Sequence, residues 1–213
     1  MPRVSLHDAI DDVARRDPVV AHLVDLAGYV AYRPRNPDGH FGALVRSIVF
    51  QQLAGAAAHA IHTRVRALVA GDLTPEALSA VPDEALRAAG LSANKLASLR
   101  DLSAKVLDGS VVLGGASARV SDEEIISRLT TVRGIGRWTA EMYLMFELRR
   151  LDVWPVDDLG VRQGYGLAWH IETPTPKQLA ALGEPFHPYR SVVARYCWEA
   201  VGLFRGGTDP SLR

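Results

Sequence analysis

Two adjacent carboxylates, Asp157 and Asp158, follow the apolar sequence VWPV at residues 153–156. The residue before a proline is kept out of the α region, so this stretch is expected to run extended up to the carboxylates. Asp157 is then expected to cap a helix that begins at Asp158. An acid at a helix start is commonly no more than a cap or a partner for the helix dipole, but the same setting keeps a carboxylate ionised beside apolar side chains. Such a carboxylate can stabilise positive charge that develops on a sugar during bond cleavage.

A second chemical feature is the sequence RGIGRWT at residues 133–139. Its two glycines can adopt positive φ and let another backbone approach closely, and a helix is expected to begin near the second glycine. Exposed amides at such a helix start form an anion site, to which the helix dipole adds. The groups expected to hold a phosphate are the backbone amides of Gly134, Gly136 and Thr139 and the side chains of Arg133 and Arg137. Taken alone, RGIG also fits a plain interhelical turn.

The elements that must position these residues are helices. Apolar residues recur at three- and four-residue spacing, without strand-like alternation bounded by turns, and this predicts an all-α fold. Helix starts are marked by Ser, Thr or Asp caps, several of them followed by proline, and helix ends are marked by glycines. The expected helices span residues 5–15, 18–29, 40–53, 56–70, 75–80, 83–89, 93–108, 122–131, 137–150, 158–168, 176–183 and 188–204.

The composition excludes several classes of protein. The single cysteine, Cys197, excludes an intrachain disulfide and a four-cysteine zinc or iron–sulfur site, and it is expected to pack in a helix. No window approaches the roughly 18 apolar residues of a membrane span, and acidic residues stand where a secretory signal would be apolar. We therefore expect a soluble, cytoplasmic protein. The formal net charge of +0 does not indicate a nucleic-acid partner, but phosphate binding depends on local charge, and arginines cluster after residue 130.

Two segments together carry a resemblance to a known family. LTTVRGIGRWTAEMYLMF at residues 129–146, followed by DVWPVDDLGVR at residues 152–162, resembles the helix-hairpin-helix, Gly/Pro-rich loop and aspartate (HhH-GPD) signature of base-excision DNA glycosylases. The match is best to their alkylated-base branch, DNA-3-methyladenine glycosylase II. Further similarity lies in FGALVRSIVFQQLAGAAA at residues 41–58, AGLSANKLASLRDLS at residues 89–103 and HPYRSVVARYCWEA at residues 187–200.

The resemblance implies an all-α fold of two helical lobes with a cleft between them. Residues 1–213 would form one glycosylase unit of two intimate lobes. The hairpin lobe would be approximately residues 35–167, and residues 1–34 plus 168–213 would form the second lobe. The match is to the compact, all-helical form, without the N-terminal β domain of the bacterial type member.

The resemblance also implies an activity. Asp158 corresponds to the catalytic carboxylate, which would stabilise oxocarbenium character at the sugar of a flipped nucleotide and orient or deprotonate the attacking water. Asp157 would then be a structural cap. Bifunctional members carry a nucleophilic lysine where this chain has Trp138, so the implied enzyme is a monofunctional hydrolase without lyase activity. It would release 3-methyladenine and 7-methylguanine from duplex DNA, which is the first step of base-excision repair.

The family's base pocket is aromatic. A large electron-rich ring such as Trp138 is suited to stack on a cationic base. Met142 stands one helical turn later, where the type member has a tyrosine, and Tyr143 is adjacent. Trp198 matches another pocket aromatic by its position, although a helical tryptophan is at least as often part of a core. The implied pocket residues are Trp138, Trp198, Met142 and Tyr143.

The resemblance also implies contacts with damaged duplex DNA. The turn FQQLA would wedge a side chain into the gap left by the flipped nucleotide: Gln52 aligns with the family's wedge, Leu53 is the better apolar plug, and a plain helix turn is the alternative. Lys95 and Arg100 are further candidates for DNA contacts, but exposed helix surface is the preferred interpretation. The family hairpin usually binds Na⁺ or K⁺ through main-chain carbonyls, which map to Thr130, Val132 and Ile135.

No metal or organic cofactor is required for this chemistry. We expect a monomer that is associated with the nucleoid and has no membrane partner. Two rival classes remain. A non-catalytic helix-hairpin-helix DNA-binding protein would keep RGIG, but it would need neither Asp158 nor the tryptophans. An iron–sulfur endonuclease-type relative with lyase activity is disfavoured by the single cysteine and by Trp138.

Overall fold

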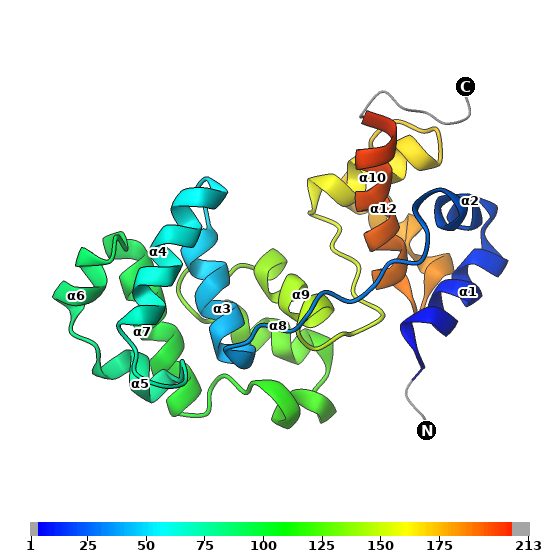
Figure 1. Ribbon diagram of the computed structural model, residues 1–213. Helices are drawn as coiled ribbons and strands as arrows, with labels where there is room; N and C mark the ends of the chain where they lie inside the picture. The colour runs from blue at the N-terminus through cyan, green and yellow to red at the C-terminus, as the bar shows by residue number, and fades with distance from the viewer. Residues whose placement is uncertain (1–3, 206–213) are drawn as a thin grey trace. The chain divides into compact units, whose positions relative to one another are not determined.

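The computed structural model of the protein describes residues 4–205, and over this range the chain is all-α, as predicted. It contains twelve α-helices and two 3₁₀ helices, and none of the described residues forms a strand (Figure 1). The chain divides into two compact units. The first unit consists of the described residues up to Arg33 and from Arg149 onward, and the second unit is Pro34–Leu148.

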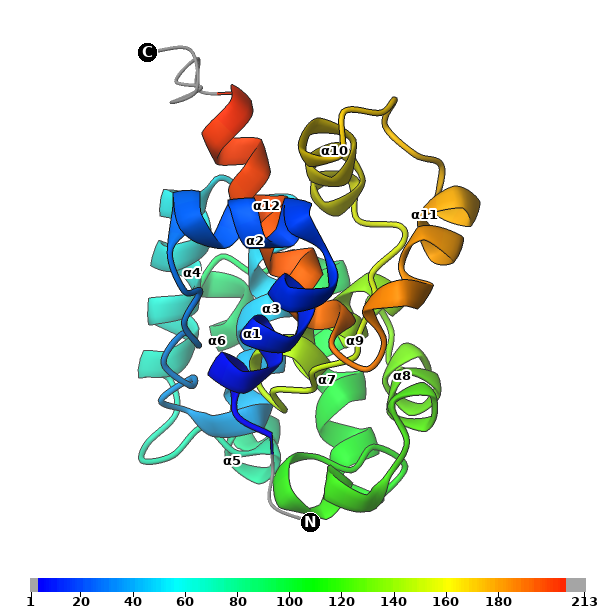
Figure 2. The ribbon, with the colours of Figure 1, turned by 90° about the vertical axis from the view of Figure 1, so that its right-hand side faces the viewer.

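The first unit is built around its last helix, α12. Its elements are α1 (Leu6–Arg16), α2 (Pro18–Ala27), α10 (Leu159–Ala168), α11 (Pro176–Leu182), η2 (Glu184–Phe186) and α12 (Arg190–Arg205). Helix α12 packs against α1, α2 and α10 (Figure 2), and its residues 191–197 are all buried. A Cβ on Gly164 of α10 would lie 1.8 Å from the carbonyl oxygen of Cys197, so α10 and α12 touch backbone to backbone. Cys197 is buried in the helix, as expected.

The second unit contains the remaining helices. They are α3 (Gly39–Phe50), α4 (Gly55–Ala67), α5 (Pro75–Ala80), α6 (Asp83–Ala88), α7 (Ala93–Leu107), η1 (Gly114–Arg119), α8 (Asp122–Thr130) and α9 (Arg137–Phe146). The core of this unit is aliphatic, with Leu44, Ile48, Leu78, Leu99, Leu102 and Leu144 at most 1% exposed. Helix α7 packs against α3, α5 and α6, while α8 and α9 pack on each other across the hairpin turn.

Two of the differences from the expected boundaries concern the residues that lead to Asp158. Helix α9 ends at Phe146 rather than near residue 150, because the backbone turns left-handed at Arg149, with a φ of 55°. The units divide at residue 148/149 rather than at the expected 167, because α10 packs along α12 and therefore belongs to the first unit. The residues just before Asp158 thus lie in the same unit as α10 and α12.

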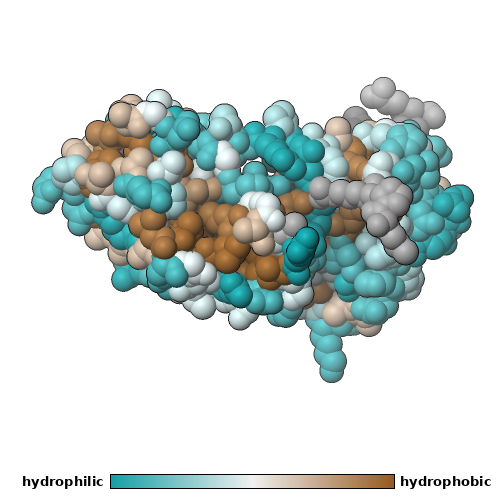
Figure 3. All heavy atoms as spheres, turned by 90° about the horizontal axis from the view of Figure 1, so that it is seen from below, coloured by the Kyte–Doolittle hydropathy of each residue, from teal (hydrophilic) through white to brown (hydrophobic). Residues whose placement is uncertain are grey.

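The surface is mixed in character. Figure 3 shows apolar side chains gathered on part of one face, with hydrophilic side chains around them. Among the described residues, none of the helices combines the length and apolar character needed to cross a membrane.

Candidate active site

Asp158 is the N-cap of α10. Its backbone is extended, with φ −71° and ψ 115°, and its Oδ1 accepts a hydrogen bond of 2.9 Å from the backbone N–H of Val161. The expectation that Asp157 caps this helix was wrong: the helix begins at Leu159, and Asp157 is exposed. A cap side chain accepts from the second or third amide of its helix, and Asp158, directly before the first helical residue, does so at Val161.

Trp198 of α12 contacts the same carboxylate. Its indole Nε1–H donates to Oδ1 of Asp158 at 3.0 Å, so one oxygen accepts from both a backbone amide and an indole. Gly160 leaves room for this contact, because a Cβ there would lie 2.9 Å from Cδ1 of Trp198 and 3.1 Å from Oδ1 of Asp158. Two donors on one oxygen fix the orientation of the carboxylate group.

The surroundings of Asp158 are partly apolar. Asp158 and Trp198 are half-buried, whereas the neighbouring side chain of Leu159 is 55% exposed. Burial, reinforced by the nearby Asp158 carboxylate, raises the pKa of the Cys197 thiol, so this thiol stays protonated at neutral pH. The side chain of Arg162, on the first turn of α10, donates from Nε to the carbonyl of Pro174 at 2.7 Å. Hydrogen bonds from both α10 and α12 therefore hold the Asp158 carboxylate.

In the second unit, the hairpin turn requires glycine at position 134. Gly134 has a φ of 78°, in the left-handed region, and a Cβ there would lie 2.7 Å from Oγ of Ser98. Its carbonyl accepts a hydrogen bond of 2.9 Å from Nε2 of Gln51. Gly136 is the N-cap of α9, and no side chain caps this helix start. The N-cap of α9 is thus a glycine, whereas most of the other α-helices have an N-cap side chain that binds a helix amide, and Thr139 on the first turn of α9 is buried.

The two arginines of the turn are bound to protein acceptors. Arg137 donates to both carboxylate oxygens of Glu123, at 2.8 and 3.0 Å, and to Glu141 at 3.0 Å. The hydrogen bonds to Glu123 are the main cause that raises the pKa of Arg137. Arg133 donates from Nη2 to Asn94 at 3.0 Å. Both arginines are exposed, and in the structure their side chains also brace the turn.

Sequence reasoning missed that α7 braces the hairpin. Oδ2 of Asp101 accepts from the backbone N–H of Arg133 at 2.7 Å and from Nζ of Lys105 at 2.8 Å. Lys105 also donates to the carbonyl of Thr131. No local pattern in the sequence indicates these contacts, because α7 is distant in the chain. The one available signal was the similarity of residues 89–103 to the family.

The expected pocket residues of α9 are placed differently from one another. Trp138, on the first turn, is 48% exposed, and the half-buried Met142 follows one turn later on the same side of the helix. Tyr143 is only 4% exposed. Its hydroxyl accepts from the backbone N–H of Gly114 at 3.3 Å and lies 3.2 Å from Nδ1 of His40, and burial raises its pKa to about 12. The expected pocket role of Tyr143 is therefore corrected: its ring belongs to the interior of the second unit.

The turn between α3 and α4 presents both expected wedge residues to solvent. Gln52 is exposed and has a left-handed φ of 55°, and Leu53 is 38% exposed. Nζ of Lys95 holds the start of the turn by donating to the carbonyls of Val49 at 2.6 Å and Gln51 at 2.8 Å. Lys95 is thus bound to protein carbonyls, and the guanidinium of Arg100 is similarly bound to Asp83 and to carbonyls of the segment 78–81.

Hydrogen bonds occupy some of the carbonyls in the hairpin, where the resemblance implies an alkali cation. The Val132 carbonyl accepts a hydrogen bond of 3.0 Å from the Ile135 amide, which leaves it a second lone pair. The intervening Thr131 carbonyl accepts from the Lys105 ammonium, so this turn already directs one carbonyl at a cation. No group of three or more His, Cys, Asp or Glu side chains in the described part of the chain could hold a metal ion.

The chain is similar to known proteins in sequence and in structure. Residues 45–188 match the family described as HhH-GPD superfamily base excision DNA repair protein. The chain is 36% identical over 185 residues to DNA-3-methyladenine glycosylase 1 of Schizosaccharomyces pombe, covering 85% of this chain and 81% of that protein. The crystal structure of DNA-3-methyladenine glycosidase from Bacillus halodurans aligns with a TM-score of 0.84 and 36% identity, over 96% of this chain and 92% of that one. A complex of Schizosaccharomyces pombe 3-methyladenine DNA glycosylase with abasic DNA aligns with a TM-score of 0.77 and 35% identity, over 92% of this chain and 97% of that one.

Proposed function

Because the chain belongs to the HhH-GPD superfamily of base excision DNA repair proteins, we propose that it is a DNA glycosylase that removes alkylated bases. Its substrates are 3-methyladenine and 7-methylguanine in duplex DNA, flipped out of the helix before cleavage. The observation that carries the proposal is the carboxylate of Asp158, oriented by Trp198 and by the Val161 amide at the start of α10. A carboxylate fixed in this way provides negative charge where positive charge develops in the transition state.

In the proposed reaction, the bond between C1′ of the sugar and the purine nitrogen breaks, and its electron pair neutralises the positive charge of the alkylated base. Asp158 stabilises the resulting oxocarbenium character and orients the water that attacks C1′. The water proton passes to the carboxylate and then to solvent. The base departs neutral, so little acid catalysis is required.

Trp138 accounts for the proposed lack of strand cleavage. A lyase needs an amine that forms a Schiff base with the sugar, and an indole cannot do so. The exposed ring of Trp138 instead offers a face on which a cationic base can stack, with Met142 one helical turn away. The products are then a free base and an intact strand that carries an abasic site.

The proposed DNA contacts come from the turns of the second unit. The backbone amides at the start of α9, which follows a glycine N-cap, bind a phosphate without reading sequence, and Gln52 or Leu53 fills the gap left by the flipped nucleotide. The carbonyls of Thr130, Val132 and Ile135 hold Na⁺ or K⁺ and strengthen this phosphate site when the ion is bound. The enzyme acts as a monomer in the cytoplasm, at the nucleoid.

The test is incubation with a panel of duplexes that each contain one alkylated base, followed by measurement of free base and abasic sites. Asp158→Asn should abolish base release but leave DNA binding largely intact, because the carboxylate acts in the transition state. Borohydride treatment during turnover should trap no covalent adduct. An active Asp158→Asn protein would overturn the assignment of Asp158, and a trapped adduct would overturn the monofunctional assignment.

A further inference from the structure

The loop that leads to Asp158, residues 151–158, is bound to α12 at two places. At its end, Asp158 accepts from Trp198, and near its start, Asp152 pairs with Arg190. Roughly two turns of α12 separate Arg190 from Trp198. A single helix thus carries both fastenings.

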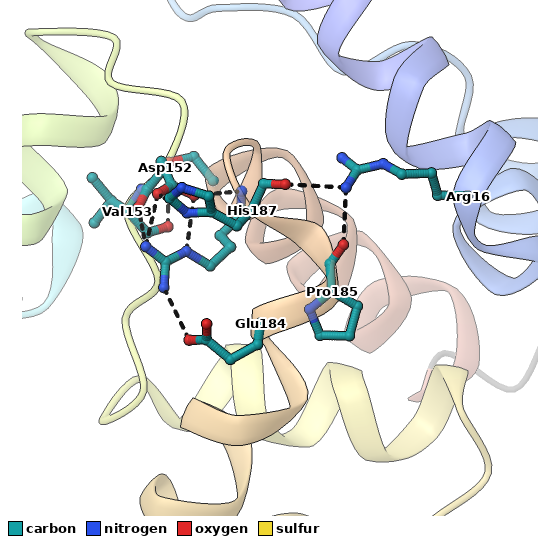
Figure 4. Close-up of polar contacts among 8 residues, drawn as sticks. Arg16, Asp152, Val153, Glu184, Pro185 and His187 are labelled. Carbon is teal, nitrogen blue, oxygen red and sulfur yellow. Dashed lines mark hydrogen bonds and ion pairs between the residues drawn. The ribbon is translucent and has the colours of Figure 1, made fainter.

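At the start of the loop, Arg190 and Asp152 form a bidentate ion pair. Nε of Arg190 donates to Oδ1 of Asp152 at 2.8 Å, and Nη2 donates to Oδ2 at 2.7 Å. Nδ1 of His187 lies 2.7 Å from the same Oδ2 (Figure 4). The side chains of Arg190 and Asp152 are only 23% and 22% exposed, and their hydrogen bond is the main cause that raises the pKa of Arg190. A planar guanidinium that binds both oxygens of a carboxylate fixes the distance and the angle between the two groups.

Ser191 adds backbone contacts beside this pair. Its amide donates to the carbonyl of Leu151 at 2.9 Å. Its buried hydroxyl accepts from the Val153 amide at 2.8 Å and donates to the Val153 carbonyl at 3.2 Å. Residues 151–153 are therefore fixed in register against the N-terminus of α12.

The segment from there to the carboxylate is short and constrained. Trp154 is buried, and its Nε1 donates to the carbonyl of Leu179 at 2.8 Å. Pro155 restricts the backbone, and its carbonyl accepts from the amide of Asp158 at 3.0 Å. A shift of the loop at Asp152 therefore passes to Asp158 instead of being absorbed between them.

We infer that Arg190 is a positioning residue, which through Asp152 sets the register of the loop so that the Asp158 carboxylate meets the Trp198 indole. This role rests on the proposed function of Asp158. A displacement of about 1 Å in a reacting group can cost about 100-fold in rate. Arg190 thus contributes to base release without touching the substrate.

The test compares Arg190→Gln with a control, Arg15→Gln. Arg15 lies in the same unit, is exposed, and donates from Nη2 to Oδ1 of Asp12 at 3.1 Å, away from His187 and Asp152. In Arg190→Gln, single-turnover base release should fall about 10- to 100-fold. Binding of abasic duplex should change less than twofold. Arg15→Gln should release base at the wild-type rate.

A second readout does not depend on activity. The indole N–H signal of Trp198 in a ¹⁵N–¹H spectrum, assigned with Trp198→Phe, should move in Arg190→Gln and stay in place in Arg15→Gln. A merely stabilising role would leave this signal unmoved well below the melting temperature. A wild type that releases no base would refute the proposed function, while the indole signal would still decide the positioning role.

Partner variants complete the test. Asp152→Asn should reproduce the effects of Arg190→Gln, and the double variant should be no slower than the slower single variant, because both changes remove one interaction. If Arg190→Gln does not fold, Ser191→Ala loosens the same register by removing the hydroxyl that holds Val153, and it should give the same shift of the indole signal. Wild-type base release together with an unmoved indole signal, in whichever of these variants folds, would overturn the inference.

Discussion

Replacement of Trp198 by phenylalanine tests the central contact of the site. The variant keeps an aromatic ring against Gly160 but removes the N–H that donates to Oδ1 of Asp158 at 3.0 Å. The Val161 amide remains as a donor, so the carboxylate keeps its cap and loses its second restraint. A hydrogen bond to a charged group contributes about 1.5–3 kcal/mol. If this contribution is lost in the transition state, the rate should fall roughly 10- to 100-fold.

The assay is single-turnover release of 3-methyladenine from a duplex at saturating enzyme, which isolates the chemical step from product release. The matched control is Trp169→Phe, because Trp169 is a half-buried tryptophan of the same unit whose indole Nε1 donates to Asp17 at 3.4 Å. Trp169→Phe should release base at the wild-type rate. If Trp198→Phe is as fast as wild type on this assay, the indole does not orient the Asp158 carboxylate for the proposed reaction, and the reasoning is refuted.

Two further predictions concern stability. Gly164→Ala should reduce the free energy of unfolding by about 1–3 kcal/mol or more, and so lower the melting temperature, because the added methyl group would lie 1.8 Å from the Cys197 carbonyl oxygen. An unchanged thermal unfolding curve would contradict the close approach of α10 and α12. The second prediction concerns the pKa of Asp101. Burial alone would raise this pKa, but hydrogen bonds from Lys105 and from the Arg133 amide lower it below its usual value. The stabilising contribution of Asp101 is therefore present above its unfolded-state pKa and is lost as the pH falls through its folded-state pKa. Asp101→Asn should therefore destabilise the protein at pH 7 more than at about pH 3 in urea unfolding, and an equal difference at both pH values would contradict this.

Local chemistry was sufficient to predict the helices. The expected caps Ser5, Asp17, Thr74, Ser92 and Thr175 each accept a hydrogen bond from an amide two or three residues later. Such bonds form within one turn of chain, so the sequence pattern contains them. The error at Asp157 was of a different kind, because two adjacent acids satisfy the same pattern and only the backbone conformation decides which one caps the helix.

The candidate site was predicted in part. The pattern of residues 133–139 and 153–158 located the turn and the carboxylate. The resemblance placed Tyr143 in a pocket because it is adjacent to Met142, yet the next residue of a helix points about 100° away from its neighbour, and contacts with His40 and Gly114 direct this ring inward. The partners of Arg133 and Arg137 were missed because they come from other helices.

The sequence by itself determined the helical class, most helix boundaries, the identity of Asp158 as the candidate acid, and the absence of a lysine at position 138. The tertiary structure alone decided that Trp198 meets Asp158, that Arg190 fastens the same loop, and that α7 braces the hairpin. The physical reason is the separation along the chain of the residues that interact. Propensities and caps act over about one helical turn, whereas these contacts join residues far apart in the chain, and they form only after the helices pack.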